Sequence, residues 1–157
     1  VRLWRNECLV ALRTPFLLTQ EMQERFYRDV ICVRQKNSRY WGIVVDEVLV
    51  GMAGLENISA ENGFGEISLI LNPADRRKNY GAKAMNLLLE QGFNYMRLNM
   101  MFGECYSCNP SIEFWREMIK KNQGYSTVLP ERKFWDGQYW DSLYFCFNAI
   151  KFVDSLL

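Results

Sequence analysis

The chain has 157 residues, 49% of them hydrophobic and 15% aromatic, and its 19 Lys and Arg nearly balance its 18 Asp and Glu. This length and apolar content predict a single folded domain with one core and exclude intrinsic disorder. The net charge of +1 argues against a nucleic-acid partner. No apolar run approaches the roughly 18 residues of a membrane span, so we expect no membrane partner either.

Cysteine and histidine content narrows the chemistry that is open to the chain. Five cysteines are present and histidine is absent. The Cys105-x-x-Cys108 pair offers too few ligands for a tetrahedral zinc site, so we predict no metal and ordinary thiols in a reducing cytoplasm. Without imidazole, Ser-His-Asp and Cys-His catalysis is excluded, and acid–base chemistry falls to carboxylate, Tyr, Cys, Lys, the N-terminus or water.

The first half of the chain predicts a helix followed by a hairpin. Thr19 can cap a helix in which apolar residues recur every four positions. Two β-branched, apolar runs, Tyr40–Val45 and Val48–Leu55, flank Asp46-Glu47 and predict a tight hairpin, although this turn lacks the usual Gly. Residues 57–65 are rich in turn formers.

The second half alternates strands and helices. An amphipathic helix is predicted from Gly81, and another over Ser111–Asn122 with Gly124 as its C-terminal cap. The remaining strands and an apolar tail are predicted at Glu66–Leu71, Met100–Cys108, Tyr125–Leu129, Tyr139–Phe147 and Ala149–Leu157. This order indicates an α/β chain with an antiparallel start and a strand–helix–strand crossover.

The segment Arg76–Ala82, which leads into the long helix, has the features of an anion site. The first turn of a helix leaves N–H groups unsatisfied and carries a partial positive charge. Arg76, Arg77 and Lys78 add charge, and Gly81 permits a tight turn or the close approach of a phosphate. A diphosphate fits this combination. A solvated basic run before an amphipathic helix is the alternative interpretation.

This loop resembles the cofactor loop of the GNAT acetyltransferases, Arg/Gln-x-x-Gly-x-Gly/Ala. Arg76 stands at the Arg/Gln position, Asn79 at the first Gly and Gly81 at the second. Asn79 departs from the motif, but Asn adopts the left-handed backbone more readily than most residues. The resemblance implies that the loop binds acetyl-CoA through Arg76, Arg77, Lys78, Asn79, Tyr80, Gly81 and Ala82.

The resemblance covers nearly the whole chain. Trp4–Asn6, Thr19–Gln23, Leu49–Gly54 and Gly137–Asp141 resemble the branch that contains ribosomal-protein-alanine and amino-sugar N-acetyltransferases. It implies a GNAT-type mixed central sheet with antiparallel N-terminal strands, a V-shaped splay between the family's fourth and fifth strands, and helices on both faces. The family's first strand would precede Val1, so residues 1–157 are expected to form one domain that starts inside the fold.

The resemblance also implies a mechanism. A primary amine on an amino sugar, a small metabolite or a peptide N-terminus would attack acetyl-CoA directly. Backbone groups of Leu69, Ile70 and Leu71 would bind the pantetheine arm, with Asn109 and Trp115 as further cofactor contacts. Glu66 matches a carboxylate that serves some relatives as the base. A solvent-facing strand residue or a structural ion pair is the alternative for Glu66.

The general acid is left open by the sequence. Relatives carry a Tyr on the helix after the fifth strand, and matching Ser111 to the motif puts Trp115 in that position, whereas matching Asn109 puts Arg116 there. Ser111 remains a possible donor. The other options are Tyr106, Tyr139 or Tyr144, or departure of the thiolate without help.

Three further expectations follow. Asp141 is interpreted as a structural carboxylate tied to backbone. A non-catalytic CoA-binding module is the alternative function, because Trp115 cannot act as an acid. The chain is expected to be a monomer or a homodimer.

Overall fold

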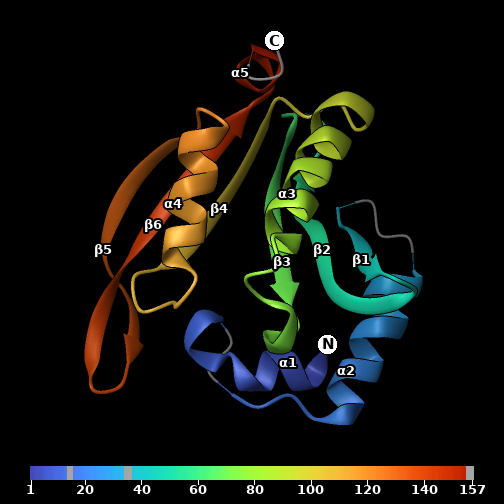
Figure 1. Cartoon of the computed structure of the whole chain (residues 1–157), viewed down its shortest axis with the longest axis vertical. Coiled ribbons are helices and arrows are strands. Elements are labelled where there is room, and N and C mark those ends of the chain that lie inside the picture. Colours follow the sequence, from blue (N-terminus) through green and yellow to red (C-terminus); the bar gives the residue numbers. More distant parts are fainter. Residues whose placement is uncertain (14–15, 34–36, 155–157) are drawn as a thin grey trace.

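The structure is a computed structural model that describes residues 1–13, 16–33 and 37–154. Six strands form one sheet in the order β1-β2-β3-β4-β6-β5 (Figure 1). The strands are β1 (Arg39–Val45), β2 (Val48–Ser59), β3 (Phe64–Leu71), β4 (Met100–Tyr106), β5 (Tyr125–Trp135) and β6 (Gln138–Asn148). The α-helices are α1 (Arg2–Glu7), α2 (Gln20–Phe26), α3 (Tyr80–Glu90), α4 (Ile112–Lys121) and α5 (Ala149–Asp154). Short 3-10 turns (Leu9–Ala11, Pro73–Asp75) and π-helical turns (Tyr27–Cys32, Gln91–Tyr95) adjoin them.

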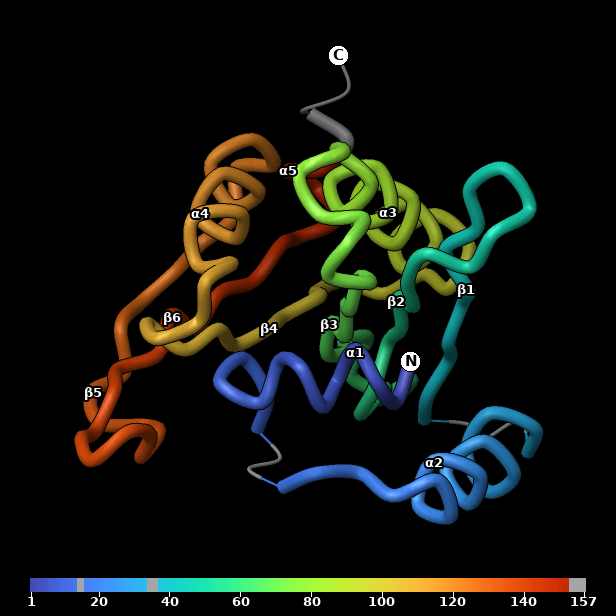
Figure 2. Tube along the Cα trace, turned by 60° about the horizontal axis from the view of Figure 1, so that its bottom comes forward, coloured from blue at the N-terminus to red at the C-terminus, as the bar shows by residue number. Residues whose placement is uncertain are grey.

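Helices cover both faces of the sheet. Figure 2 shows α3 and α4 on one face and α1 and α2 on the other. The core lies between the sheet and the α3–α4 layer, where Leu55, Met85, Leu89, Met101 and Phe145 are fully buried. The predicted mixed sheet with an antiparallel start and helices on both faces is therefore confirmed.

The predicted helices form because their local signals agree with their burial. The Thr19 hydroxyl accepts a hydrogen bond from the Met22 amide at 3.2 Å and caps α2. In α3, Ala84, Met85, Leu88 and Leu89 are buried at the spacing of one helix face. The helix starts at Tyr80, one residue before the predicted start.

The β1–β2 hairpin has the predicted two-residue turn. Val45 pairs with Val48, and the two residues between them, Asp46 and Glu47, have φ values of 47° and 63°. Left-handed backbone at both central positions is what a type I′ turn requires. The turn therefore forms here without the Gly that usually provides it.

Several boundaries differ from the predictions. Strand β2 extends to Ser59, which pairs with Phe64, and β5 extends to Trp135. Helix α1 was not predicted, because its short sequence shows no clear apolar period. The prediction that Gly124 caps α4 was wrong, since Gln123 takes the left-handed backbone with φ 52°. A Cβ on Gly124 would instead lie 2.9 Å from the carbonyl oxygen of Cys146 in β6.

The sheet divides where β3 and β4 separate. The two strands are parallel and pair only through Phe64↔Met100, Gly65↔Met101 and Glu66↔Phe102. Beyond Glu66, β3 continues to pair with β2 alone, and β4 continues to pair with β6 alone. This is the V-shaped splay that the resemblance implies, and it leaves the inner edge of residues 67–71 without a neighbouring strand.

Candidate active site

The loop before α3 presents free backbone donors. Arg77 and Asn79 both have φ 62°, and the Asn79 side chain makes no capping hydrogen bond to α3. The amides of residues 77–82 have no acceptor among the described residues. Left-handed residues next to a helix N-terminus point successive N–H groups to one place, which is the geometry that binds an anion. Asn79 thus adopts the conformation for which relatives use Gly.

The basic side chains of this loop point in different directions. Arg76 reaches the end of α1 and donates to the Cys8 sulfur at 2.7 Å. Lys78 pairs with Asp75 at 2.8 Å, and Arg77 is exposed. The Tyr80 side chain lines a groove between β1 and α3. The side chains of Arg76 and Lys78 are therefore held by Cys8 and Asp75, and the free amides are the backbone donors of this loop that have no partner among the described residues.

The predicted residues of the splay lie at its two walls. Leu69, Ile70 and Leu71 occupy the free edge of β3, with Leu69 packed against the core. Gly81 is buried where α3 approaches α4, since a Cβ there would meet Leu71 Cδ1 at 3.3 Å and Phe114 Cε2 at 3.4 Å. Gly81 is needed for close packing rather than for left-handed backbone. Ala82 follows it and packs against the core.

The start of α4 is built from the other predicted contacts. The side chain of buried Asn109 accepts a hydrogen bond from the Ser111 amide at 2.8 Å and so shapes the turn before the helix. Ser111 precedes α4, but its hydroxyl does not cap the helix. Trp115 stacks on Phe145 of β6 with ring centroids 4.9 Å apart. Much of its ring is therefore occupied by packing inside the protein.

Glu66 lies at the last paired position before the splay and is buried, with 7% of its surface exposed. One carboxylate oxygen accepts a hydrogen bond from the Arg13 guanidinium, and the other accepts one from the Asn57 side chain at 2.8 Å. It faces the α1 side of the sheet, as strand alternation predicts, while Ile67 and Leu69 face the core. Glu66 is therefore a partnered, buried carboxylate and not a solvent-facing one.

Glu104 on β4 is a second carboxylate that sequence reasoning missed. Its Oε1 accepts hydrogen bonds from the Ser142 hydroxyl at 2.7 Å and from Arg132 Nε at 3.2 Å, and its Oε2 lies 3.7 Å from Arg13 Nη2. Burial would raise its pKa, but the Ser142 hydroxyl and the two Arg charges together hold it below the usual value. The signal that marks it is a charged residue inside an otherwise apolar strand.

Two of the three candidate tyrosines lie beside these carboxylates. Tyr144 is directly opposite Glu104 in the β4–β6 register, and Tyr106 lies two residues further along β4. Burial, and then the Glu104 carboxylate, raises the pKa of Tyr106. Burial, and then Cys146 and the carboxylates of Glu66 and Glu104, raises the pKa of Tyr144. Tyr139 is exposed and packs on Phe134 near the β5–β6 turn, far along the hairpin from Glu104.

Sequence comparison decides the family. Residues 2–113 match the family described as Acetyltransferase (GNAT) domain. The chain belongs to the GNAT acetyltransferase family. It is an acetyl-CoA-dependent N-acetyltransferase by that membership, with acetyl transfer to an amine as its reaction. No curated protein matches the chain.

Solved GNAT structures share the fold. A spermidine N-acetyltransferase from Vibrio cholerae, solved in complex with CoA and spermine, superposes with a TM-score of 0.84 at 16% identity, over 97% of this chain and 89% of that one. Mutant forms of the spermidine/spermine N-acetyltransferase from the same organism give a TM-score of 0.83 at 16% identity, over 99% of this chain and 90% of that one. At this identity the likeness establishes the fold alone.

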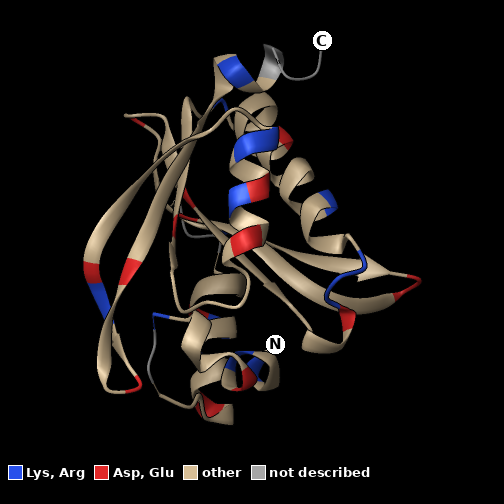
Figure 3. Cartoon of the chain, turned by 60° about the vertical axis from the view of Figure 1, so that its left-hand side comes forward, with Lys and Arg blue, Asp and Glu red and all other residues tan. Residues whose placement is uncertain are grey.

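Other charged residues of the GNAT domain are structural or dispersed. Asp141 accepts a hydrogen bond from the Glu131 amide at 3.0 Å, as expected of a carboxylate tied to backbone. Figure 3 shows acidic and basic residues interspersed along the helices, strands and loops. Within the described ranges, no group of three or more Cys, Asp or Glu could hold a metal ion, and no helix is long and apolar enough to cross a membrane.

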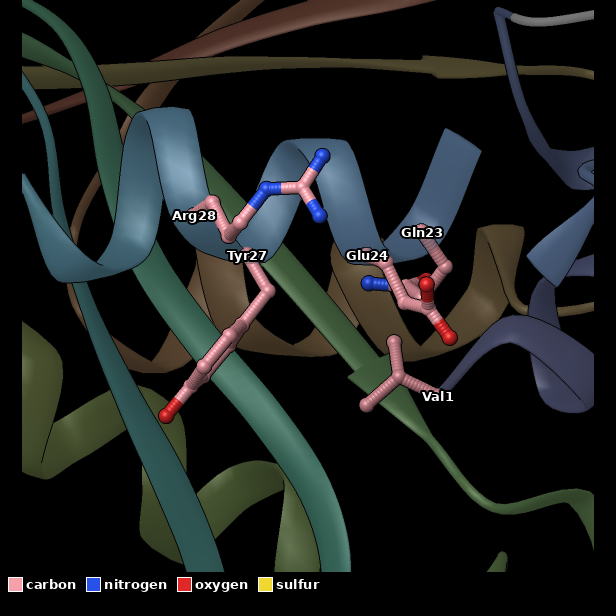
Figure 4. A pocket seen from close by; sticks show the side chains of 5 residues that line it. All are labelled: Val1, Gln23, Glu24, Tyr27 and Arg28. Carbon is pink, nitrogen blue, oxygen red and sulfur yellow. The ribbon is translucent and has the colours of Figure 1, made fainter. Parts of the chain in front are cut away.

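Two hollows lie away from the carboxylate pair. One, of about 560 Å³, is the groove between β1 and α3 that includes Trp41, Tyr80 and Leu87. The other, of about 460 Å³, is open to solvent, and Figure 4 shows its lining side chains on α2 and the π-helical turn that follows it, with Val1 opposite. Neither is lined by Glu66 or Glu104, and among residues 77–82 only Tyr80 lines one of them, the groove between β1 and α3.

Proposed function

We propose that this GNAT domain acetylates a primary amine on a small cationic molecule and that Glu66 takes the proton from that amine. The observation that carries the proposal is the buried carboxylate pair, Glu66 and Glu104, beside the point where β3 and β4 separate. An acceptor that takes the place of Arg13 beside this pair is attracted more strongly if it carries several ammonium groups than if it carries a single charge. The name of the spermidine N-acetyltransferases that share the fold supports a polyamine as the first compound to test.

The loop before α3 fits the diphosphate of acetyl-CoA. Its free amides and the αL residues Arg77 and Asn79 provide converging donors, and Arg76 and Lys78 are within the same loop. The free inner edge of residues 67–71 offers backbone groups that suit the amides of the pantetheine arm. When bound, acetyl-CoA supplies the acetyl group as an activated thioester.

Glu66 and the nearby tyrosines are assigned opposite proton transfers: Glu66 removes a proton from the amine, and a tyrosine donates one to the thiolate. An alkyl ammonium group has a pKa of about 10 and must lose a proton before it can attack. We assign that proton to Glu66, directly or through a water, and the polarisation of the thioester carbonyl to a backbone N–H on the free edge of β3. Tyrosine hydroxyls are protonated near neutral pH at their ordinary pKa of about 10, and the pKa values of Tyr106 and Tyr144 are raised further. We assign to one of these hydroxyls the donation of a proton to the departing thiolate.

A non-catalytic CoA-binding module is the second candidate. The observation that favours it is Trp115, which stacks on Phe145 at the helix position where relatives carry their tyrosine acid. Under this hypothesis the cofactor loop retains its function, while the carboxylate pair holds the protein together and performs no chemistry.

One assay separates the two candidates. Release of the CoA thiol is measured with acetyl-CoA and three acceptors: spermidine, glucosamine and a peptide with an N-terminal alanine. For the variant Glu66→Gln we expect kcat to fall about 100-fold or more, because a positioned base contributes about 100-fold to 10,000-fold. The exposed Glu61 is the matched control, and Glu61→Gln should leave kcat unchanged.

Binding of CoA is measured in parallel by calorimetry. Gly81→Leu should weaken CoA binding, because even a Cβ at this position meets Leu71 and Phe114, whereas Glu66→Gln should not. For the wild-type enzyme, kcat/KM should rise with pH toward the pKa of the acceptor amine, about 10. CoA binding without turnover of any of the three acceptors would favour the non-catalytic module.

A further inference from the structure

Residues 1–13 cross the mouth of the splayed sheet on the side where α1 lies. The Arg13 side chain, at the end of this segment, lies between the carboxylates of Glu66 and Glu104. Arg13 Nη2 contacts Glu66 on β3 and lies 3.7 Å from Glu104 on β4. These strands stop pairing at Glu66 and Phe102. The Arg13 guanidinium therefore links β3 and β4, the two limbs of the splay, at the point where they separate.

Two anchors hold this segment, one on each limb. Arg76, which follows the β3 limb, donates to the Cys8 sulfur at the end of α1. On the other limb, Lys133 of β5 donates to the carbonyl oxygens of Leu9, Val10 and Leu12 at 3.2, 2.6 and 2.6 Å. The Lys133 ammonium also lies over the Tyr106 ring, 4.8 Å from its centroid. We call residues 1–13 the strap.

Arg13 itself is held less firmly than the carboxylates that it pairs with. Its side chain is 53% exposed, whereas those of Glu66 and Glu104 are 9% and 8% exposed. The last anchored carbonyl is that of Leu12, so the Arg13 side chain can swing toward solvent while the strap stays in place. Glu104 would still have Arg132, but within the described residues Arg13 is the only cation paired with Glu66.

A buried carboxylate left without a counter-ion is costly, so Arg13 leaves readily only when another cation replaces it. We propose that Arg13 is the specificity-determining residue of the acceptor site: it occupies the place of the acceptor's charged amine and gives way to amines that can take over its contact with Glu66. This inference rests on the proposed function. It makes the Arg13 side chain a built-in competitor for cationic acceptors.

The test compares steady-state kinetics of wild type, Arg13→Ala and Arg13→Lys at saturating acetyl-CoA, with spermidine and phenethylamine as acceptors. Arg25→Ala, which removes the same charge from an exposed pair with Glu21 on α2, is the matched control. We expect Arg13→Ala to lower KM for spermidine about 1.5-fold to fivefold, the range for loss of one exposed ion pair. Phenethylamine, with one charge, should gain less, Arg13→Lys should lie between, and Arg25→Ala should match wild type.

The outcomes separate this inference from the proposed function. An unchanged or raised KM for Arg13→Ala, with turnover and CoA affinity intact, overturns the competitor role and leaves acetylation standing. A raised KM for both Arg13→Ala and Arg13→Lys would mean that Arg13 helps to bind the acceptor. CoA binding without turnover in any variant overturns both proposals. Turnover that appears only in Arg13→Ala supports both.

Discussion

The carboxylate of Glu104 takes its hydrogen bonds from two other strands. Ser142 on β6 and Arg132 on β5 both reach its Oε1. These contacts stabilise the charged form, which is why the pKa of Glu104 stays below its ordinary value of 4.5 even though burial acts to raise it. A single buried side chain on β4 thus connects three strands and the strap.

This lowered pKa predicts an acid-sensitive contribution to stability. As pH falls below 4.5, the unfolded chain protonates Glu104 before the folded chain does, so the free energy of unfolding decreases. The stabilisation is complete above that pH and is lost as pH falls through the folded pKa. In Glu104→Gln the decrease between about pH 5 and pH 3 should be shallower than in wild type, as measured by urea denaturation at a series of pH values.

The control for this measurement is Glu113→Gln on α4. The Glu113 side chain is 70% exposed, and its ion-pair partner is Arg116 of the same helix. Its substitution should leave the pH dependence close to that of wild type. Parallel curves for Glu104→Gln and wild type would show that Glu104 is not the source of the acid sensitivity.

Asn79 stands where the GNAT motif has Gly, and its backbone angle explains how Asn fits there. With φ 62° it takes the left-handed conformation that Gly provides in relatives. We expect Asn79→Gly to change the free energy of unfolding by no more than a few tenths of a kcal/mol, whereas Asn79→Val should cost about 1–2 kcal/mol. The same chemical denaturation assay, with CoA calorimetry beside it, measures both effects. Equal stability of the two variants would contradict the role of the backbone angle.

Helix α3 carries the cofactor loop into the core. Leu88 packs into the core with 3% of its surface exposed, while its neighbour Leu87 is 62% exposed in the groove beside β1. Leu88→Ala should therefore lower the free energy of unfolding by about 2–5 kcal/mol. Leu87→Ala, the control on the same helix, should change it by about 0.5 kcal/mol or less. Equal losses of unfolding free energy in the two variants, measured by guanidinium denaturation, would show that Leu88 contributes no more to the core than Leu87 does.

Helix α4 shows why a motif position does not by itself define a role. Trp115 stands at the position of the relatives' tyrosine acid in one register, yet its ring stacks on Phe145 and contacts Phe114. The buried tyrosine on β4, Tyr106, lies on the carboxylate side instead. The proton donor that we propose has therefore moved from the helix to the sheet.

At the scale of the whole molecule, Lys133 is the anchor that connects the strap to the β5–β6 hairpin. Its ammonium satisfies three strap carbonyls from inside a buried position on β5. Lys133→Met keeps the length of the side chain but removes every donor. The orphaned carbonyls should lower the free energy of unfolding by about 1–3 kcal/mol.

Hydrogen exchange measures the local part of this effect. Amides of the strap should exchange faster in Lys133→Met than in wild type, while amides of β2 and β3 should change little. Lys120→Met on the exposed side of α4 is the control. Unchanged exchange in the strap would show that Arg76, Arg13 and apolar contacts hold it without Lys133.

Much of the fold and of the cofactor loop could be predicted from the sequence, because those features are local. The spacing of apolar residues over α3, the cap at Thr19 and the run Arg76–Ala82 before a helix all depend on neighbours a few residues away. Strand alternation likewise placed Glu66 opposite Leu69 on β3. The boundaries of β2, β5 and α4 were less accurate, since pairing partners and packing set where an element ends.

The contacts of the carboxylate pair were decided by the tertiary structure alone. Arg13 and Glu66 are separated by 53 positions in the chain, and Lys133 and Val10 by 123. No local pattern relates such residues, because only the folding of α1 beneath the splayed sheet brings them within reach. The sequence by itself predicted a diphosphate site at Arg76–Ala82, and the folded chain determined which charged side chains meet where β3 and β4 separate.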